Sequence, residues 1–134
     1  MLFRSVSDGT RSVIAAMDAS AVRRLVAVST CSVPDARDLP DAKFKALAQF
    51  VKTAAPTPYQ EVRRAAEIVR ASGLDWTLVR VAKLNNNDAA GQVKAGYYGH
   101  GAVGLSISRA DMAAFLLDQA ANLTYLRQAP AISN

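Results

Sequence analysis

Hydrophobic residues recur at helical spacing in four segments of the chain, and compact apolar runs lie between these segments. The helical spacing predicts helices over residues 8–19, over a segment that starts at Asp41, over residues 54–73 and over residues 107–121. The apolar runs predict buried strands over residues 23–30 and 74–81, with a last short strand over residues 130–134.

The predicted helices carry recognisable faces and end signals. In the third helix, Thr57 is placed to cap the N-terminus, Pro58 suits the first turn, and Gly73 is placed to end the helix in the left-handed conformation. The fourth helix starts with a capping box made by Ser108 and Asp111. The apolar faces are expected to contain Val13, Ile14 and Met17 in the first helix, and Val62, Ala66 and Val69 in the third.

Strands that alternate with helices predict an α/β fold, in which helices cover both faces of a parallel sheet. Sheets of this type bind ligands at the carboxyl ends of their strands. In this sequence those ends are Ser29–Thr30 and Arg80–Ala82. We therefore expect the functional residues to lie at these two positions.

Residues 99–104 read GHGAVG and match the G-x-G-x-x-G pattern of dinucleotide-binding loops. Such a loop must leave a strand and open a helix directly, so that the helix amides meet the phosphates. Four residues with strand-like alternation, 105–108, separate this motif from the next predicted helix. We interpret residues 94–108 as a hairpin with a flexible glycine turn, and not as a phosphate-binding loop.

Composition and charge narrow the classes of protein to consider. The chain has 134 residues, enough for one domain, and a net charge of +5. Its arginines are scattered over several predicted elements with few aromatic residues among them, which argues against nucleic acid as a partner. The apolar runs are far shorter than the roughly 18 residues of a membrane span, so no membrane association is expected. The single Cys31 suits a reducing, cytoplasmic location.

Several stretches resemble one known family. The sequences AAEIVRASGLDWTLVR (65–80), ISRADMAAFLL (107–117) and YLRQAPAISN (125–134) are similar to the C-terminal half of NAD(P)H-binding proteins of the atypical short-chain dehydrogenase/reductase group. That group includes NmrA-like proteins and biliverdin/flavin reductase-like enzymes. The strand RRLVAVST (23–30) resembles the central strand of the same group.

The resemblance implies that residues 1–134 form a single partial Rossmann-like domain, a parallel sheet with flanking helices that lacks the N-terminal half with the glycine-rich loop. Such a loss leaves one edge of the central strand unpaired. We therefore expect a homo-oligomer in which a second copy covers this exposed sheet edge.

The resemblance also implies roles for residues at the predicted site. Ser29 and Thr30 match hydroxyls that face the nicotinamide or the substrate, although strand-end hydroxyls also satisfy backbone groups. Tyr59 and Arg63 have the spacing of the family's catalytic Tyr-x-x-x-Lys pair, with arginine in place of lysine. The same spacing also arises by coincidence in a helix, so both interpretations stay open.

A second group of candidates follows the strand over residues 74–81. Arg80 corresponds to the family's Arg-Pro step beside the nicotinamide, with Val81 in place of the proline. The resemblance implies a cofactor contact for Arg80, Val81, Ala82 and Lys83. The alternative for Arg80 is an ion pair with a buried carboxylate such as that of Glu67.

The remaining conspicuous residues favour ordinary roles. His100 has no acidic or cysteine neighbours, so an exposed loop histidine is expected, and no metal-ligand spacing occurs in the sequence. Cys31 is expected to be a structural or incidental thiol and not a nucleophile, and Trp76 is expected in the core.

The sequence therefore predicts an NAD(P)-binding protein that acts, if it is an enzyme, as an NAD(P)H-dependent reductase. Its substrate would be a small carbonyl or flavin-like acceptor, and its cofactor NADP or NAD. The alternative is a non-catalytic NmrA-like dinucleotide sensor or a protein-interaction module.

Overall fold

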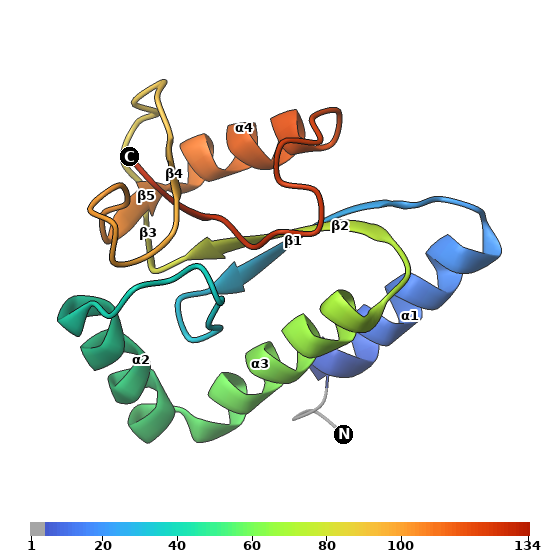
Figure 1. The fold of residues 1–134 in the computed structure, drawn as a ribbon, viewed down its shortest axis with the longest axis horizontal. Coiled ribbons are helices and arrows are strands. Elements are labelled where there is room, and N and C mark those ends of the chain that lie inside the picture. Colours follow the sequence, from blue (N-terminus) through green and yellow to red (C-terminus); the bar gives the residue numbers. More distant parts are fainter. Residues whose placement is uncertain (1–4) are drawn as a thin grey trace.

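The computed structural model describes residues 5–134. Its main sheet has four strands in the order β1-β2-β6-β4 (Figure 1). β2 pairs in parallel with β1 and with β6, whereas β4 runs antiparallel to β6. The α/β sheet predicted from the sequence is confirmed as a mainly parallel sheet. The strands are β1 (Arg24–Thr30), β2 (Asp75–Val81), β4 (Lys94–Gly96) and β6 (Ala131–Ser133).

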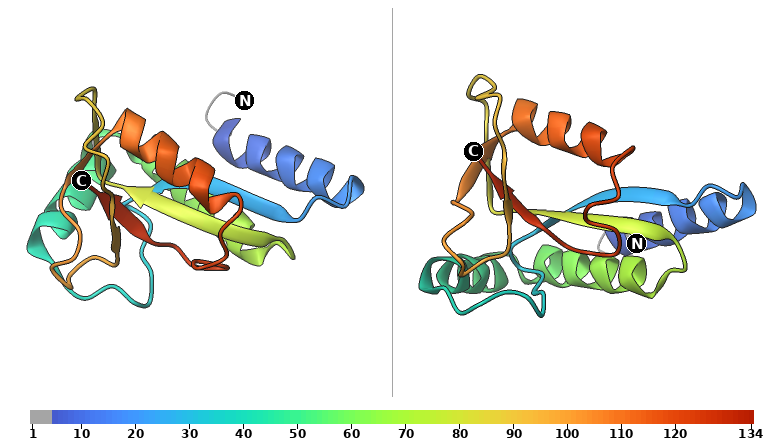
Figure 2. Two further views of the ribbon diagram at one scale, coloured as in Figure 1. Left: turned by 90° about the horizontal axis from the view of Figure 1, so that it is seen from above. Right: turned by 45° about the horizontal axis from the view of Figure 1, so that its top comes forward.

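Helices cover both faces of this sheet. Figure 2 shows α1 and α3 side by side on one face and α4 on the opposite face. α2 lies near the carboxyl end of β1 (Figure 1). Two further strands, β3 (Lys83–Asn85) and β5 (Ser106–Ser108), pair in parallel and form a separate small sheet. The helices are α1 (Ser5–Ala19), α2 (Ala42–Ala54), α3 (Pro56–Ala71) and α4 (Arg109–Gln119).

β2 is buried on both faces. Successive side chains of a strand point in opposite directions, so alternate residues of β2 pack into two different clusters. Trp76 and Leu78 pack against Ala66 and Val69 of α3, which confirms the predicted core position of Trp76. On the other face, the β2 residues Val79 and Val81 form a second cluster with Ile107 and Ile132, and Met112 and Phe115 of α4 pack against that cluster.

β1 is not the buried strand that its apolar run predicts. It forms the edge of the sheet, and no strand within residues 5–134 pairs with its outer side. Val28 is 49% exposed as a result. On α1, Ile14 packs against the core, but Val13 is 50% exposed, so the predicted apolar face is correct only in part.

The predicted hairpin over residues 94–108 is wrong. β4 pairs with β6 from the end of the described chain, and β5 pairs with β3. The turn between β4 and β5 does contain glycines with positive φ, at Gly99 and Gly101. Alternating residues around a glycine turn predict two strands correctly, but they do not identify the partner of each strand.

One of the predicted helix-end signals is confirmed, and two others are wrong. Ser108 caps α4, with its Oγ accepting a hydrogen bond from the Asp111 amide at 3.1 Å. α3 starts at Pro56 with Ala55 as its cap, so Thr57 lies inside the helix. Gly73 does not have a positive φ, and the extended residue Ser72 ends the helix instead.

Candidate functional site

The pairing of β1 with β2 places the two predicted strand ends side by side. Ser29 is aligned with Arg80, and Thr30 with Val81. The Thr30 Oγ1 accepts a hydrogen bond from the Ser32 amide at 3.2 Å. The Ser29 hydroxyl is buried and has no hydrogen-bond partner among residues 5–134. A buried hydroxyl without a partner is uncommon and calls for an explanation.

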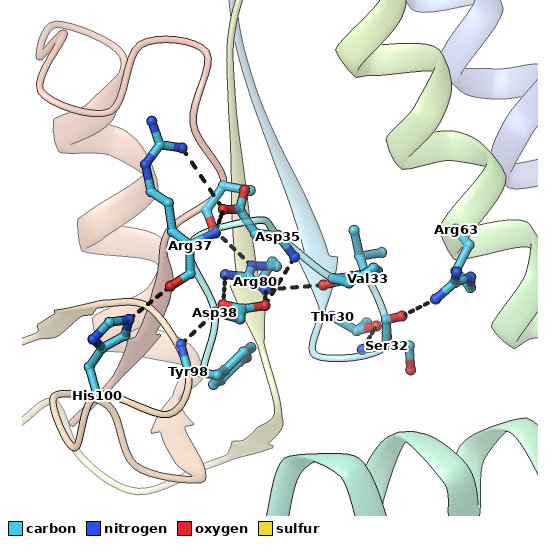
Figure 3. Close-up of polar contacts among 12 residues, drawn as sticks. Thr30, Ser32, Val33, Asp35, Arg37, Asp38, Arg63, Arg80, Tyr98 and His100 are labelled. Carbon is cyan, nitrogen blue, oxygen red and sulfur yellow. Dashed lines mark hydrogen bonds and ion pairs between the residues drawn. The ribbon is translucent and has the colours of Figure 1, made fainter. Parts of the chain in front are cut away.

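Arg80 is fully buried and is held by groups of the chain itself (Figure 3). Its guanidinium forms two hydrogen bonds to the Asp38 carboxylate, at 2.7 and 2.8 Å. Two more bonds reach the carbonyl oxygens of Ala129 and Val33, at 2.8 and 3.1 Å. This geometry favours the ion-pair alternative for Arg80, with Asp38 and not Glu67 as the partner.

Asp38 is the centre of this network. Besides Arg80, its carboxylate accepts hydrogen bonds from the backbone amides of Asp35 and Tyr98. Burial raises the pKa of Asp38, but the hydrogen bonds and the charge of Arg80 outweigh it, so that the pKa lies below its ordinary value. The network fixes the loop over residues 31–41 against the end of β2.

A pocket of about 340 Å³ opens beside this loop at the carboxyl end of β1. The loop, α2, the first half of α3 and Tyr98 form its walls. Tyr59 and Arg63 both line it, so the structure brings together the two residues of the predicted pair. The Arg63 guanidinium lies 5.3 Å from the centre of the Tyr59 ring, and its Nη1 donates to the Ser32 carbonyl at 2.9 Å.

The other candidates that follow β2 differ in exposure. Val81 is buried and, with Ser29 and Thr30, lines a second, apolar pocket of about 260 Å³ along the edge of β1. Ala82 packs against the cluster of buried residues around Tyr98. Lys83 is exposed at the start of β3. Of the predicted set, Tyr59 and Arg63 thus line the first pocket and Ser29, Thr30 and Val81 the second. Arg80, Ala82 and Lys83 line neither of these two pockets.

Cys31 lies in the pocket near Tyr59, half-buried and not bonded to another cysteine. Burial raises the pKa of its thiol above the ordinary value, and this effect exceeds the opposing effects of a backbone hydrogen bond and of Arg80. A thiol with a raised pKa is a poor nucleophile at neutral pH. The raised pKa favours the expected structural or incidental thiol, which stays a prediction.

The GHGAVG turn packs against protein and does not open a helix. Gly99 has φ +87°, and a Cβ there would lie 2.2 Å from the Leu39 carbonyl oxygen. The exposed His100 places its Nε2 2.8 Å from the Arg37 carbonyl oxygen. Residue 99 is a glycine because a larger side chain would collide with the Leu39 backbone. The contacts agree with a packed turn and not with a phosphate-binding loop.

Sequence reasoning did not identify Asp38 or Tyr98. Both lie in irregular segments, where no periodicity marks a buried side chain. Arg80 was the available signal, because an arginine at the end of an apolar strand requires a carboxylate when it is buried. Asp38 in the adjacent loop is that carboxylate.

Residues 5–134 contain neither a metal-binding cluster nor a helix able to span a membrane. No group of three or more histidine, cysteine, aspartate and glutamate side chains in this part of the chain is arranged to hold a metal ion. No helix in the same range has the length and apolar character needed to cross a bilayer.

Solved structures with a similar fold come from several bacteria. ChuY, an anaerobillin reductase from Escherichia coli O157:H7, superposes with a TM-score of 0.76 at 19% identity over 96% of this chain and 58% of its own. A short-chain dehydrogenase/reductase from Veillonella parvula in complex with NADP gives 0.72 at 23% identity over 98% and 59%. A Rossmann-fold NAD(P)-binding family protein from Shigella flexneri gives 0.69 at 24% identity over 97% and 55%.

The chain thus spans between about half and two thirds of the length of such structures, from 52% to 65%. At these identities the likeness shows the fold, a partial Rossmann-like domain. No curated protein sequence matches the chain. A sequence profile of NAD(P)H-binding domains, however, matches residues 3–123, which is most of the chain. The resemblance seen in the sequence is confirmed: the chain belongs to the family of NAD(P)H-binding domains.

Proposed function

We propose that this chain supplies the nicotinamide side of an NAD(P)H-dependent reductase that acts on a small carbonyl or flavin-like acceptor. The observation that carries this proposal is the pocket at the carboxyl end of β1, lined by Tyr59 and Arg63. The unpartnered hydroxyl of Ser29, whose residue lines the second pocket along the edge of β1, supports it. Doubly wound sheets bind cofactor and substrate at this end of their strands.

The described residues fit one end of a dinucleotide. The buried Ser29 hydroxyl is suited to a hydrogen bond with an amide or carbonyl group. Val81 ends β2, and Ala82 and Lys83 follow it at the same end of the sheet. We assign these three residues to contacts with the side of the nicotinamide ring. Arg80 receives no cofactor contact, because Asp38 and two carbonyl groups occupy its guanidinium. None of α2, α3 and α4 starts after a glycine-rich turn, so the fit does not extend to the pyrophosphate.

NAD(P)H, when bound, supplies the hydride that reduces the carbon of the acceptor. The residues of the chain hold the acceptor, stabilise negative charge on its oxygen and deliver a proton to that oxygen. Ser29 and Thr30 are assigned to donate hydrogen bonds to the acceptor carbonyl. The Ser29 oxygen can accept from the nicotinamide amide at the same time, as the Thr30 oxygen accepts from the Ser32 amide. Tyr59 is assigned to deliver the proton, and Arg63 to hold the Tyr59 ring in position.

Calorimetric titration of NADPH and NADH into the purified chain tests the proposal, with the mass in solution recorded in parallel. Micromolar binding, followed by NADPH oxidation in the presence of a quinone or flavin, is the expected result. Ser29→Ala should weaken this binding, whereas Ser12→Ala on the exposed face of α1 should leave it unchanged. No binding at millimolar cofactor, in any oligomeric state, refutes the proposal.

A non-catalytic dinucleotide sensor or interaction module is the second candidate. One observation favours it: Arg63 replaces the expected lysine, and one of its nitrogens is already bonded to the Ser32 carbonyl. Arginine and lysine are not equivalent beside a proton donor. Saturable binding of NADPH without turnover of any quinone or flavin supports the sensor over the reductase.

We also propose that a second copy of the chain covers the outer edge of β1. The unpaired backbone groups of this edge, the exposed Val28 and the apolar pocket beside them form a surface that a symmetric strand pair buries. Val28→Lys should convert the dimer to a monomer in light scattering. Val13→Lys, which changes a residue of equal exposure on α1, should leave the dimer intact. A monomeric wild-type chain at high concentration contradicts the proposal.

We place this activity in the cytoplasm. The reason is chemical, since Cys31 is a free thiol in the site and a reducing compartment preserves it. Imaging of a tagged chain in its native cell tests the location, and a signal outside the cytoplasm contradicts it.

A further inference from the structure

Three consecutive carbonyl groups in the loop over residues 31–41 are each bonded to a different arginine. Two of these arginines belong to α3 and one belongs to β2, so the bonds fix this part of the loop against both elements. The same part of the loop forms a wall of the pocket at the carboxyl end of β1. The bonds run from Arg63 to the Ser32 carbonyl at 2.9 Å, from Arg80 to the Val33 carbonyl at 3.1 Å (both in Figure 3) and from Arg70 to the Pro34 carbonyl at 3.0 Å.

Arg63 differs from the other two arginines because it has no charged partner within residues 5–134. Arg80 is paired with the Asp38 carboxylate at 2.7 Å. Arg70 is paired with the Asp35 carboxylate at 3.3 Å. A guanidinium binds an anionic acceptor more strongly than it binds a neutral carbonyl. An anion beside Arg63 would therefore displace the loop carbonyl from this arginine, whereas the other two arginines would keep their contacts.

A further cavity of about 350 Å³, which we call the α2–α3 groove, gives an anion access to Arg63. Arg63 and Tyr59 line both this groove and the pocket at the end of β1, so the two side chains lie between the cavities. The lining contains three cations and one carboxylate. Lys52 forms no ion pair within residues 5–134, and Arg64 is paired with Glu61 at 3.0 Å. The lining residues are Lys52, Tyr59, Gln60, Arg63, Arg64 and Glu67.

From this arrangement we infer that the α2–α3 groove binds a phosphate group, which draws Arg63 away from the Ser32 carbonyl and loosens the loop beside Cys31. Two guanidinium groups and an ammonium group supply the donors that phosphate requires. The volume of the groove is in the range of small-molecule sites, so the phosphate is either free or attached to a small polyol. The inference goes beyond the proposed reductase and does not require bound cofactor.

Calorimetric titration of inorganic phosphate into the full chain tests the site, with sodium chloride of equal ionic strength as the reference. Lys52→Gln should weaken binding by about two- to fivefold, because it removes one cation from the lining. Glu67→Gln should strengthen binding by about the same factor, because it removes the carboxylate. The matched controls Lys94→Gln and Asp88→Asn change exposed residues outside the groove and should leave the affinity unchanged.

The side chains of Lys52 and Glu67 are exposed and form no hydrogen bond or ion pair within residues 5–134, so both variants should keep the wild-type melting temperature. Equal affinities of these variants and the wild type overturn the site, as does an absence of binding at phosphate concentrations on the order of 10 mM. A parallel titration with glycerol 3-phosphate distinguishes the two sources. Tighter binding than that of inorganic phosphate supports a polyol phosphate, and equal or weaker binding supports the free ion.

The rate at which iodoacetamide labels Cys31 tests the link between the groove and the loop. Saturating phosphate should increase this rate by about twofold or more, because the loop beside Cys31 opens more often once the Ser32 carbonyl is released. Arg63→Met removes the donor, so it should label faster without phosphate and should not respond to phosphate. An unchanged wild-type rate at saturating phosphate, or an equal response of Arg63→Met, overturns the link.

Discussion

Replacing Asp38 by asparagine should destabilise the fold far more than its partial exposure suggests. The change keeps the shape of the side chain but removes the charge opposite Arg80. Arg80 is 0% exposed, while the Asp38 side chain is 19% exposed, so the guanidinium is left without a counter-charge inside the protein. Removing one partner of a buried ion pair costs about 3–5 kcal/mol. That is a large part of the roughly 5–15 kcal/mol that stabilises a typical domain.

The double variant Asp38→Asn/Arg80→Met reveals the origin of this loss. Arg80→Met removes the cation, but it also leaves the carbonyl oxygens of Val33 and Ala129 without their donors, at a cost of about 1 kcal/mol or more for each. The double variant avoids the unpaired buried charge, so its loss should be smaller than the sum of the two single losses. Urea unfolding of the four proteins, followed by circular dichroism, gives a coupling free energy of about 2 kcal/mol or more.

Acid unfolding supplies a second measurement on the same pair. Because the pKa of Asp38 is lowered in the folded state, its stabilising effect is complete above the unfolded-state pKa of about 3.9. The effect is lost as the pH falls through the lower, folded-state pKa. The wild type should therefore lose stability below about pH 4 more steeply than Asp38→Asn. Additive single losses, or identical acid profiles, would refute a coupled buried ion pair.

Three further changes test other parts of the structure. Gly99→Ala should destabilise the chain more than Gly101→Ala does. Both glycines have a positive φ, but only at residue 99 would the new Cβ contact the Leu39 carbonyl. Equal melting temperatures of the two variants contradict this packing. Ser108→Ala should cost about 1 kcal/mol in urea unfolding by removing the cap of α4, with the exposed Ser12→Ala as a neutral control. Cys31 should react slowly with iodoacetamide at neutral pH, because burial raises the pKa of its thiol. The rate of this reaction should still increase above pH 9, where the rate of a small free thiol levels off. Fast labelling at pH 7 contradicts the raised pKa.

The sequence predicted the elements whose patterns are long and local. β2 was identified because its apolar run is continuous over several residues. α3 was identified because its apolar face repeats over several helical turns. The N-terminal cap of α4 was identified because capping depends on residues three positions apart. The buried state of β1 was predicted wrongly, since its composition resembles that of β2 and only the number of neighbouring strands separates them.

The site was predictable at the strand ends and not in the loops. Ser29, Thr30 and Arg80 follow apolar runs, and parallel pairing places them at one end of the sheet. Asp38 and Tyr98 meet Arg80 from segments 42 and 18 residues away in the chain, where no repeat indicates direction or burial. The partner of β4 was missed for the same reason, because three-residue strands contain too little pattern to specify a register.

The place of β6 in the sheet sets the order in which the sheet can be completed. β6 is the last strand along the chain, yet it lies between β2 and β4. β4 emerges from the ribosome well before β6, its only sheet partner within residues 5–134, and it stays unpaired with β6 until residues 131–133 have been synthesised. A chain interrupted shortly before β6 therefore exposes two open strand edges in place of one central strand. Stalled or clipped forms that lack β6 should need chaperones more than forms that contain it.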